Sequence, residues 1–253
     1  MSKRNSNNKN NKWTAVILIA LAIVGALIGD QSFLKEYEKD QGLGHGFSSF
    51  LDNFGAFDKN KYKVTEKSEY YVIDKNPPQF SEEDLKNREV YANYSPLDSL
   101  NRVGPANALL GKELMPIEKR KDISKVYPTG WHQKRFDFIE GGVLYNRCHL
   151  IGFQLAGEND NWLNLMTGTR SFNTKGMLPF ENVVADYIKD TGKKVRYRVT
   201  PIFIDDELVA RGVIMEAYSV EDGGKAINFR VLVKNIEKGV SIDYKTGRSK
   251  RLK

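Results

Sequence analysis

Side chains of the kinds used in hydrolysis gather in the stretch Gly141–Asn173, GGVLYNRCHLIGFQLAGENDNWLNLMTGTRSFN. It holds one of the three histidines and the only cysteine of the 253-residue chain. Histidine is the side chain whose ordinary pKa suits a general base near neutral pH. A guanidinium group pairs well with phosphate oxygens. His149, with Arg147 two residues before it, therefore supplies a base and a phosphate ligand, and we predict an active site here.

Oxygen-bearing side chains follow the histidine. Asn164 and Asn173 offer neutral amide oxygens, and Glu181 offers a carboxylate. Magnesium prefers oxygen ligands and keeps several of its waters, and a hard cation can neutralise a phosphate and the leaving oxygen. The ordered set is that of a metal-assisted phosphodiesterase.

Two kinds of element have to position these groups. Val143–Tyr145 is a β-type run before a polar corner, which predicts a strand that delivers His149 to a surface. The segment Pro179–Lys189 is predicted to be a helix that begins at a proline and is ended by Gly192. Its apolar residues form one stripe: Phe180, Val183, Val184, Tyr187 and Ile188.

The remaining pattern is mostly that of strands. Tyr70–Ile73 is predicted to be a strand, and Ser81 begins a short helix with acidic residues in its first turn. After the central helix, hairpin turns at aspartate and glycine separate further runs. These are Lys194–Ile204, Leu208–Val220, Ala226–Ile236 and Val240–Tyr244. Strands before and after the helix predict an α+β domain on an antiparallel sheet.

The chain ends differ from its middle. Residues 1–12 are polar and basic, and residues 13–29 are an apolar run without charge. The positive residues before this run place the N-terminus in the cytoplasm and the domain outside. We predict a transmembrane signal anchor at 13–29, with secretion after cleavage as the alternative. A stalk (30–66), the catalytic domain (67–244) and a basic tail (245–253) complete the predicted organisation.

The net charge of +7 belongs to those ends. Residues 1–12 carry +4 and residues 245–253 carry +5, which leaves −2 for residues 13–244. The basic character is therefore no evidence that the folded domain binds nucleic acid, and phosphate contacts must come from local clusters. One cysteine excludes an intramolecular disulfide framework but does not decide the compartment.

The residues around His149 resemble the signature of the DNA/RNA non-specific endonucleases, which have the ββα-metal (His-Me finger) fold. That signature is Asp-Arg-Gly-His, and it stands here as Asn146-Arg147-Cys148-His149, followed by Leu150-Ile151-Gly152. The segments 164–166 and 169–173 look like the part that supplies a metal-binding asparagine. The run 194–200 is similar to a strand of the streptococcal DNA-entry type. The resemblance covers roughly residues 70–244.

The resemblance implies a role for each position. His149 would activate the attacking water, and Asn173 would be the only direct protein ligand of one Mg²⁺, with Mn²⁺ as the alternative ion. Glu181 would hold a metal-bound water, and Asn164 would place His149 or those waters. Arg147 would contact the phosphate. DNA, and also RNA, would be the substrate, and the products would carry 5′-phosphate and 3′-hydroxyl ends.

Basic residues elsewhere are candidates for a nucleic-acid groove. Arg196 and Arg198 share one face of a predicted strand, which favours a phosphate-contacting ridge. Lys134 and Arg135 follow an aromatic turn, and Lys119–Lys121 form a further cluster. A solvated face explains each of these runs about as well.

Two positions depart from the family pattern and leave alternatives open. Asn146 replaces an aspartate, which removes a charge near His149 and keeps open a nuclease fold that binds DNA without cleaving it. Cys148 replaces a glycine, and would be strained if the backbone there needed a positive φ. A surface transpeptidase or peptidase using Cys148 with His132 is a different enzyme class. Asn173 as a helix cap and Glu181 as a surface residue are the structural alternatives at those positions.

Overall fold

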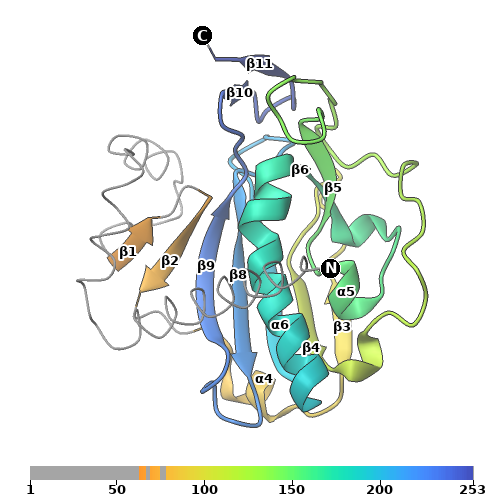
Figure 1. Ribbon diagram of the computed structural model, residues 1–253. Helices are drawn as coiled ribbons and strands as arrows, with labels where there is room; N and C mark the ends of the chain where they lie inside the picture. Colours follow the sequence, from red (N-terminus) through yellow and green to blue (C-terminus); the bar gives the residue numbers. More distant parts are fainter. Residues whose placement is uncertain (1–62, 67–68, 75–77, 253) are drawn as a thin grey trace, which may run out of the picture. The chain divides into compact units, whose positions relative to one another are not determined.

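The computed structural model describes residues 63–66, 69–74 and 78–252, which belong to one unit, Asn53–Lys253. A seven-stranded sheet lies at its centre (Figure 1), and every neighbouring pair of strands in it is antiparallel. In spatial order the strands are β1 (Lys63–Glu66), β2 (Tyr70–Asp74), β9 (Asn228–Lys234), β8 (Gly212–Ser219), β7 (Val195–Ile202), β4 (Ala106–Leu110) and β3 (Tyr91–Tyr94).

The longest strands lie together in the sheet. The eight residues of β7 pair with the eight of β8, from Val195↔Ser219 to Ile202↔Gly212. Alternate residues of β7 are fully buried in the main core: Val195, Tyr197 and Val199. Since successive strand residues point to opposite faces, the residues between them lie on the other face of the sheet.

One long helix covers the core face of the sheet. Helix α6 (Leu178–Thr191) has Pro179 in its first turn and ends at Gly192, which has a φ of +67° and donates its N–H to Ile188 O. Its buried side chains include Phe180, Val184, Ala185 and Ile188. Full burial of a valine, isoleucine or phenylalanine side chain contributes about 1.5–3 kcal/mol to the stability of the fold. The predicted helix Pro179–Lys189 and its apolar stripe agree with the structure.

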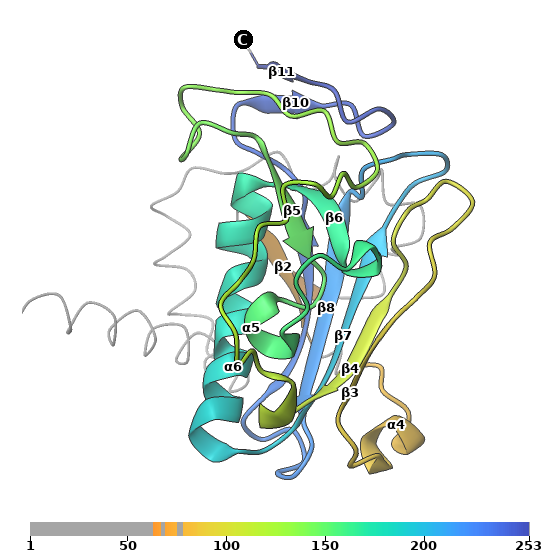
Figure 2. The same cartoon turned by 90° about the vertical axis from the view of Figure 1, so that its right-hand side faces the viewer.

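A hairpin precedes this helix and forms a β-β-α unit with it. Strands β5 (Tyr145–His149) and β6 (Leu165–Thr169) pair antiparallel, with His149 opposite Leu165. The chain then enters the π-helical turn η3 (Phe172–Met177) and continues directly into α6. Helix α5 (Phe153–Ala156) and the 3₁₀ turn η2 (Trp162–Asn164) lie between the two strands in sequence. Figure 2 shows this unit on the α6 side of the sheet.

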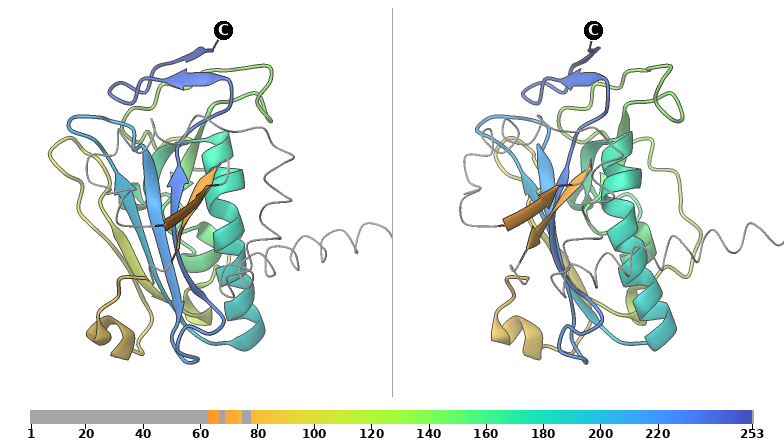
Figure 3. Two further views of the ribbon diagram at one scale, coloured as in Figure 1. Left: turned by 90° about the vertical axis from the view of Figure 1, so that its left-hand side faces the viewer. Right: turned by 60° about the vertical axis from the view of Figure 1, so that its left-hand side comes forward.

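The other face of the sheet carries the short helix α4 (Glu82–Lys86), and Figure 3 shows it opposite α6. The side chain of Ser81 accepts a hydrogen bond from Asp84 N (3.0 Å), and Asp84 accepts in return from Ser81 N (3.1 Å), which makes a capping box. The predicted start at Ser81 agrees with the structure. A 3₁₀ turn, η1 (Lys112–Leu114), follows β4.

The structure differs from the predicted organisation at both ends of the domain. Strand β1 lies inside the predicted stalk and pairs with β2. At the other end, β11 (Ser249–Arg251) pairs with β10 (Val240–Ile242), so the predicted basic tail is partly a strand. Tyr145 Oη donates to the backbone oxygen of Gly247 (2.9 Å), which ties this segment to β5.

The predicted anchor at 13–29 lies outside the described residues. Within the part of the chain that the structure describes, there is no helix with the length and apolar character needed to cross a bilayer.

Candidate active site

His149 is the last residue of β5. It shares a strand face with Arg147, and its side chain is only 6% exposed, so the strand delivers it to a largely covered position rather than to an open surface. Its Nε2 lies 2.8 Å from the backbone oxygen of Asn159. A carbonyl oxygen can only accept, so Nε2 carries the proton and Nδ1 is the nitrogen with a free lone pair.

Burial sets the charge of this histidine. The pKa of His149 is lowered from 6.5 to about 4, chiefly by desolvation on burial. The backbone acceptors at Asn159 and Glu158 act in the raising direction, and the positive charge of Arg120 adds to the lowering. The imidazole is therefore neutral at pH 7. At that pH the imidazole is in the form that can accept a proton, although its low pKa also makes it a weaker base.

Asn164 holds the backbone just after His149. Its Oδ1 accepts from Ile151 N (2.9 Å), and its Nδ2 donates to Ile151 O (3.0 Å). Its own backbone oxygen accepts from Leu150 N (2.8 Å). The side chain is fully buried. Both ends of the amide are thus engaged with the backbone of one residue, Ile151, so of the two expected roles the geometry supports placing His149 and not holding metal waters.

Asn173 lies in the π turn that precedes α6. Leu178 N donates to Asn173 O, a bond between residues five apart, where an α-helix would join residues four apart. In a regular α-helix, Asn173 and Glu181 would be about 2.2 turns apart and would point in different directions. The wider π turn changes this relative direction, and both side chains leave the one continuous segment that η3 and α6 form.

Glu181 is buried beneath α5. It is 8% exposed, and a Cβ atom on Gly152 would lie 2.7 Å from its Oε2. Burial raises the pKa of Glu181 to about 8, and Arg120 acts in the lowering direction. The alternative of a solvated surface glutamate does not fit this position.

These groups could hold a hydrated cation. Among the described residues there is no cluster of three or more His, Cys, Asp or Glu side chains of the kind that encloses a metal. The amide oxygen of Asn173 and the buried carboxylate of Glu181 would instead suit a site in which water fills most positions. That donor set suits magnesium, which dehydrates reluctantly.

Arg120 is a site residue that sequence reasoning did not single out. It belongs to the basic run after η1, and it is exposed. Its charge acts on the pKa values of both His149 and Glu181, so it lies within electrostatic reach of both. Its membership of a three-residue basic cluster was the only signal for it, and that signal did not distinguish it from its neighbours.

Arg147 holds the loop that precedes β5. Its Nε donates to Val126 O, and its Nη2 donates to Ser124 O (2.5 Å). Its guanidinium carbon lies 4.2 Å from the ring centroid of Trp131 and 5.2 Å from that of Tyr127. Arg147 thus fastens the loop 124–131 to β5 through two of the five N–H donors of its guanidinium, and its contact with phosphate stays a prediction.

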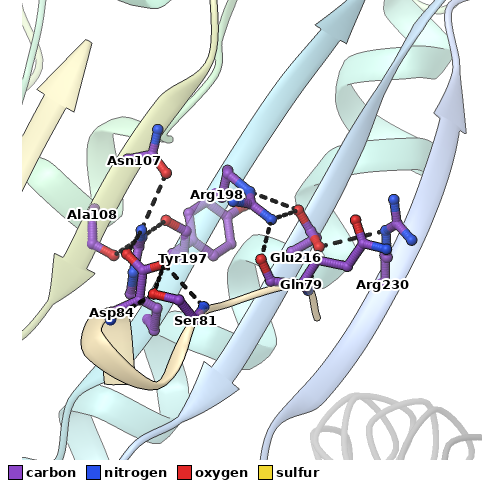
Figure 4. Close-up of polar contacts among 10 residues, drawn as sticks. Gln79, Ser81, Asp84, Asn107, Ala108, Tyr197, Arg198, Glu216 and Arg230 are labelled. Carbon is purple, nitrogen blue, oxygen red and sulfur yellow. Dashed lines mark hydrogen bonds and ion pairs between the residues drawn. The ribbon is translucent and has the colours of Figure 1, made fainter. Parts of the chain in front are cut away.

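The two predicted ridge arginines lie on the sheet face away from α6, because alternate residues of β7 pack into the core under that helix. Figure 4 shows Arg198 beside Glu216 and Gln79. Arg196 is 3% exposed and donates to Asp84 (2.9 Å). Arg198 donates to Glu216 (2.7 Å) and to Gln79 O (2.8 Å). A phosphate-contacting ridge beside His149 does not fit this placement, since both arginines are committed to internal partners on the other face.

Lys134 and Arg135 are exposed in the loop before β5. Lys134 Nζ donates to the backbone oxygen of Ser249 (3.1 Å), and Arg135 forms an isolated bridge with Val143. Both remain accessible to a nucleic acid, and their role stays a prediction.

Cys148 is fully buried, and its Sγ donates to Asn146 O (3.5 Å). Burial raises the pKa of the thiol well above its ordinary range. His132 is exposed in a loop. Cys148 is not one of the residues with positive φ, so the expected strain is absent at this described position. A buried thiol of raised pKa is a poor nucleophile, so this geometry does not support the peptidase alternative.

Comparison with known proteins decides the class of this site. The family model for DNA/RNA non-specific endonucleases matches residues 82–221, more than half of the chain. The chain belongs to this family. The matched segment includes His149, Asn164, Asn173 and Glu181, and membership of the family makes the chain an endonuclease that acts on nucleic acid.

Solved structures agree with this assignment. NucA from Streptococcus agalactiae with no metal bound is 25% identical, has a TM-score of 0.69, and the match covers 83% of this chain and 97% of NucA. Sda1 nuclease with a bound zinc ion is 26% identical, with a TM-score of 0.58 and coverage of 70% and 94%. The magnesium-bound form of NucA, at 24% identity, has the same fold, with a TM-score of 0.69 and coverage of 83% and 98%. The predicted resemblance to this family is confirmed.

Proposed function

We propose that the chain hydrolyses phosphodiester bonds of DNA, and of RNA, with little sequence preference and with His149 as the general base. One observation carries this proposal: His149 is buried and neutral, its Nε2 is held by Asn159 O at 2.8 Å, and its Nδ1 is the free nitrogen. In this arrangement Nδ1 takes the proton of the attacking water, and the bond to Asn159 stabilises the imidazolium that results.

The other groups hold the phosphate and a cation. Asn173 offers one amide oxygen to a divalent ion, and Glu181 holds the water around it once its carboxyl is ionised. The bound ion supplies Lewis-acid stabilisation of the negative charge that develops on the phosphate. Arg120 adds a fixed positive charge beside both His149 and Glu181. Oxygen donors favour Mg²⁺, with Mn²⁺ as an alternative, and zinc-bound Sda1 nuclease supports a divalent ion in general.

The site is proposed to work outside the cell. The apolar run 13–29 with positive residues before it would anchor the chain in the membrane with the domain outside, or would be removed on secretion. An external site gives the enzyme access to extracellular DNA. Lys134 and Arg135 are proposed to contact the backbone of a bound strand, because they are exposed in the loop that leads into β5.

A cleavage assay on the full chain tests this function. Plasmid DNA incubated with the chain and Mg²⁺ should be degraded, and a chelator should abolish the degradation. His149→Ala should lower the rate at least 100-fold, as expected for loss of a general base. The matched control is His132→Ala, which removes an exposed histidine and should keep the wild-type rate. Full activity of His149→Ala would exclude the mechanism.

A further inference from the structure

A cavity lies beside His149 that the cleavage mechanism does not use. Its volume is about 220 Å³, and it lies between the segment after η1 and helix α5. Met115, Ile117 and Phe153 supply apolar walls, and Gly157 and Asn159 close one side. The side chain of Ile117 is 100% exposed, which is unusual for a large aliphatic residue. Pockets for drug-sized ligands are larger, roughly 300–1,000 Å³, so this one suits a single ring system.

Asn159 joins this cavity to the catalytic histidine. Its backbone oxygen binds His149 Nε2 (2.8 Å), and its side-chain Oδ1 accepts from Lys121 N (3.0 Å). The residue that fixes the tautomer of the base is therefore also part of the cavity wall. Asn159 thus separates a group in the cavity from the imidazole of His149.

The rim of the cavity is basic. Lys119 and Lys121 line it, and Arg120 lies between them in sequence. Glu118 also lines it and pairs with Lys121 (3.2 Å), so the segment 118–121 keeps a net positive charge. Apolar walls with cationic side chains at the edge match a nucleotide, which has a flat apolar ring and a negative phosphate.

We propose that this cavity receives an unstacked nucleobase of the strand that is cleaved, next to the scissile phosphate. The inference rests on the proposed function, because it places the base relative to a phosphate held at His149. Phe153 and Met115 offer aromatic and thioether surface for the ring. Lys119 and Lys121 hold the adjoining phosphates.

The choice of substrate strand follows from this geometry. A base inside a duplex is stacked and paired, and removing it from the stack has an energetic cost that is smallest for a single strand or a mismatched position. The chain should therefore cleave single-stranded positions, strand ends and mismatches faster than internal duplex positions, with little preference among the four bases.

A substrate contrast tests the proposal. The full chain is incubated with one of two end-labelled single-stranded oligonucleotides. One has a normal sequence, and the other has abasic residues on both sides of one phosphodiester bond. The value of kcat/KM for cleavage at that bond is measured by gel electrophoresis. A stacked base contributes about 1–3 kcal/mol, which corresponds to roughly a 5- to 150-fold loss for the abasic strand. Met115→Ala with Ile117→Ala should lose much of the activity on the normal strand and become insensitive to abasic substitution.

Two controls keep the result interpretable. Leu252→Ala removes an exposed apolar side chain (55% exposed) that does not line the cavity, and should leave both rates unchanged. Ile117→Ala alone serves if the double variant does not fold, because a fully exposed side chain contributes little to the core.

Three outcomes would overturn the proposal. The first is an abasic strand that is cleaved as fast as the normal strand by the wild-type chain. The second is a variant that stays fully sensitive to abasic substitution. The third is a loss in Lys119→Ala that is equal on both substrates, together with no effect of the apolar substitutions, since the cavity would then hold a phosphate. If the wild-type chain cleaves neither strand, the proposed function itself fails.

Discussion

The carboxylate of Glu181 lies directly against the backbone of Gly152, three residues after His149, where a Cβ atom would stand 2.7 Å from Oε2. This contact couples helix α6 to the segment that carries the catalytic base. Gly152 has a φ of −56° and a ψ of 146°, an extended conformation that alanine adopts without strain. Replacing Gly152 by alanine therefore changes only its contact with the Glu181 carboxylate.

Gly152→Ala should therefore displace the Glu181 carboxylate, since the end of a flexible side chain moves more easily than the backbone. We expect a chain of near wild-type thermal stability whose cleavage rate falls at least 10-fold. Combining Gly152→Ala with Glu181→Gln should add little to the loss caused by Glu181→Gln alone. Independent, multiplicative losses would show that the two residues do not act through this contact.

Glu181→Gln should stabilise the metal-free protein at high pH. Burial raises the pKa of Glu181 in the folded state from 4.5 to about 8, so the folded state binds the proton more tightly than the unfolded state does. Wild-type stability is then lost as pH rises from about 4.5 to 8, by roughly 4–5 kcal/mol. Urea unfolding with a chelator should show the variant more stable at pH 8 and equal at pH 4. A difference independent of pH would contradict the buried, protonated carboxyl.

Asn164→Ala should destabilise the fold, and it should lower activity only because His149 is no longer held in position. It leaves the N–H and C=O of Ile151 buried without partners, at roughly 1–3 kcal/mol for each group. Asn164→Asp keeps the acceptor for Ile151 N and should recover part of the stability. Urea unfolding of both variants measures this. Equal stability of Asn164→Ala and the wild type would show that the amide does not hold the backbone.

Arg147→Lys should loosen the loop 124–131, because a lysine cannot reproduce the two donor bonds to Ser124 and Val126 or stack on Trp131 in the same way. Hydrogen exchange of that loop should rise while the salt dependence of DNA binding stays unchanged. If exchange stays the same, and if Arg147→Ala, which removes the charge that lysine keeps, makes the slope of log affinity against log salt shallower by about 1, Arg147 binds phosphate instead.

Local signals in the sequence predicted much of this fold. Helix α6 could be predicted because its proline, its apolar stripe and Gly192 all act within a few residues. The hairpin strands β7–β9 could be predicted for the same reason. Strands β3 and β4 were not predicted: they are short, and β4 pairs with β7, some 90 residues later in the chain.

The arginines show where sequence reasoning about the site ends. Residue type gives the charge of Arg196, but its partner Asp84 lies 112 residues away, and only the folded sheet brings the two together. Arg147 likewise finds its acceptors 21 and 23 residues earlier in the chain. The π turn at Asn173 has no residue-type signature, so it could not be foreseen either.

The pH dependence of cleavage, with and without His149, tests the central claim most directly. Burial lowers the pKa of His149 to about 4, and a bound cation favours the ionised form of Glu181. At saturating Mg²⁺ the wild-type inflection that His149 causes should therefore lie near pH 4, with the rate falling as pH drops through it. His149→Gly should be inactive and regain cleavage with added imidazole, now with its inflection near the ordinary imidazole pKa of about 6.5. A variant that imidazole does not rescue, or a rescued profile identical to that of the wild type, would contradict His149 as the general base.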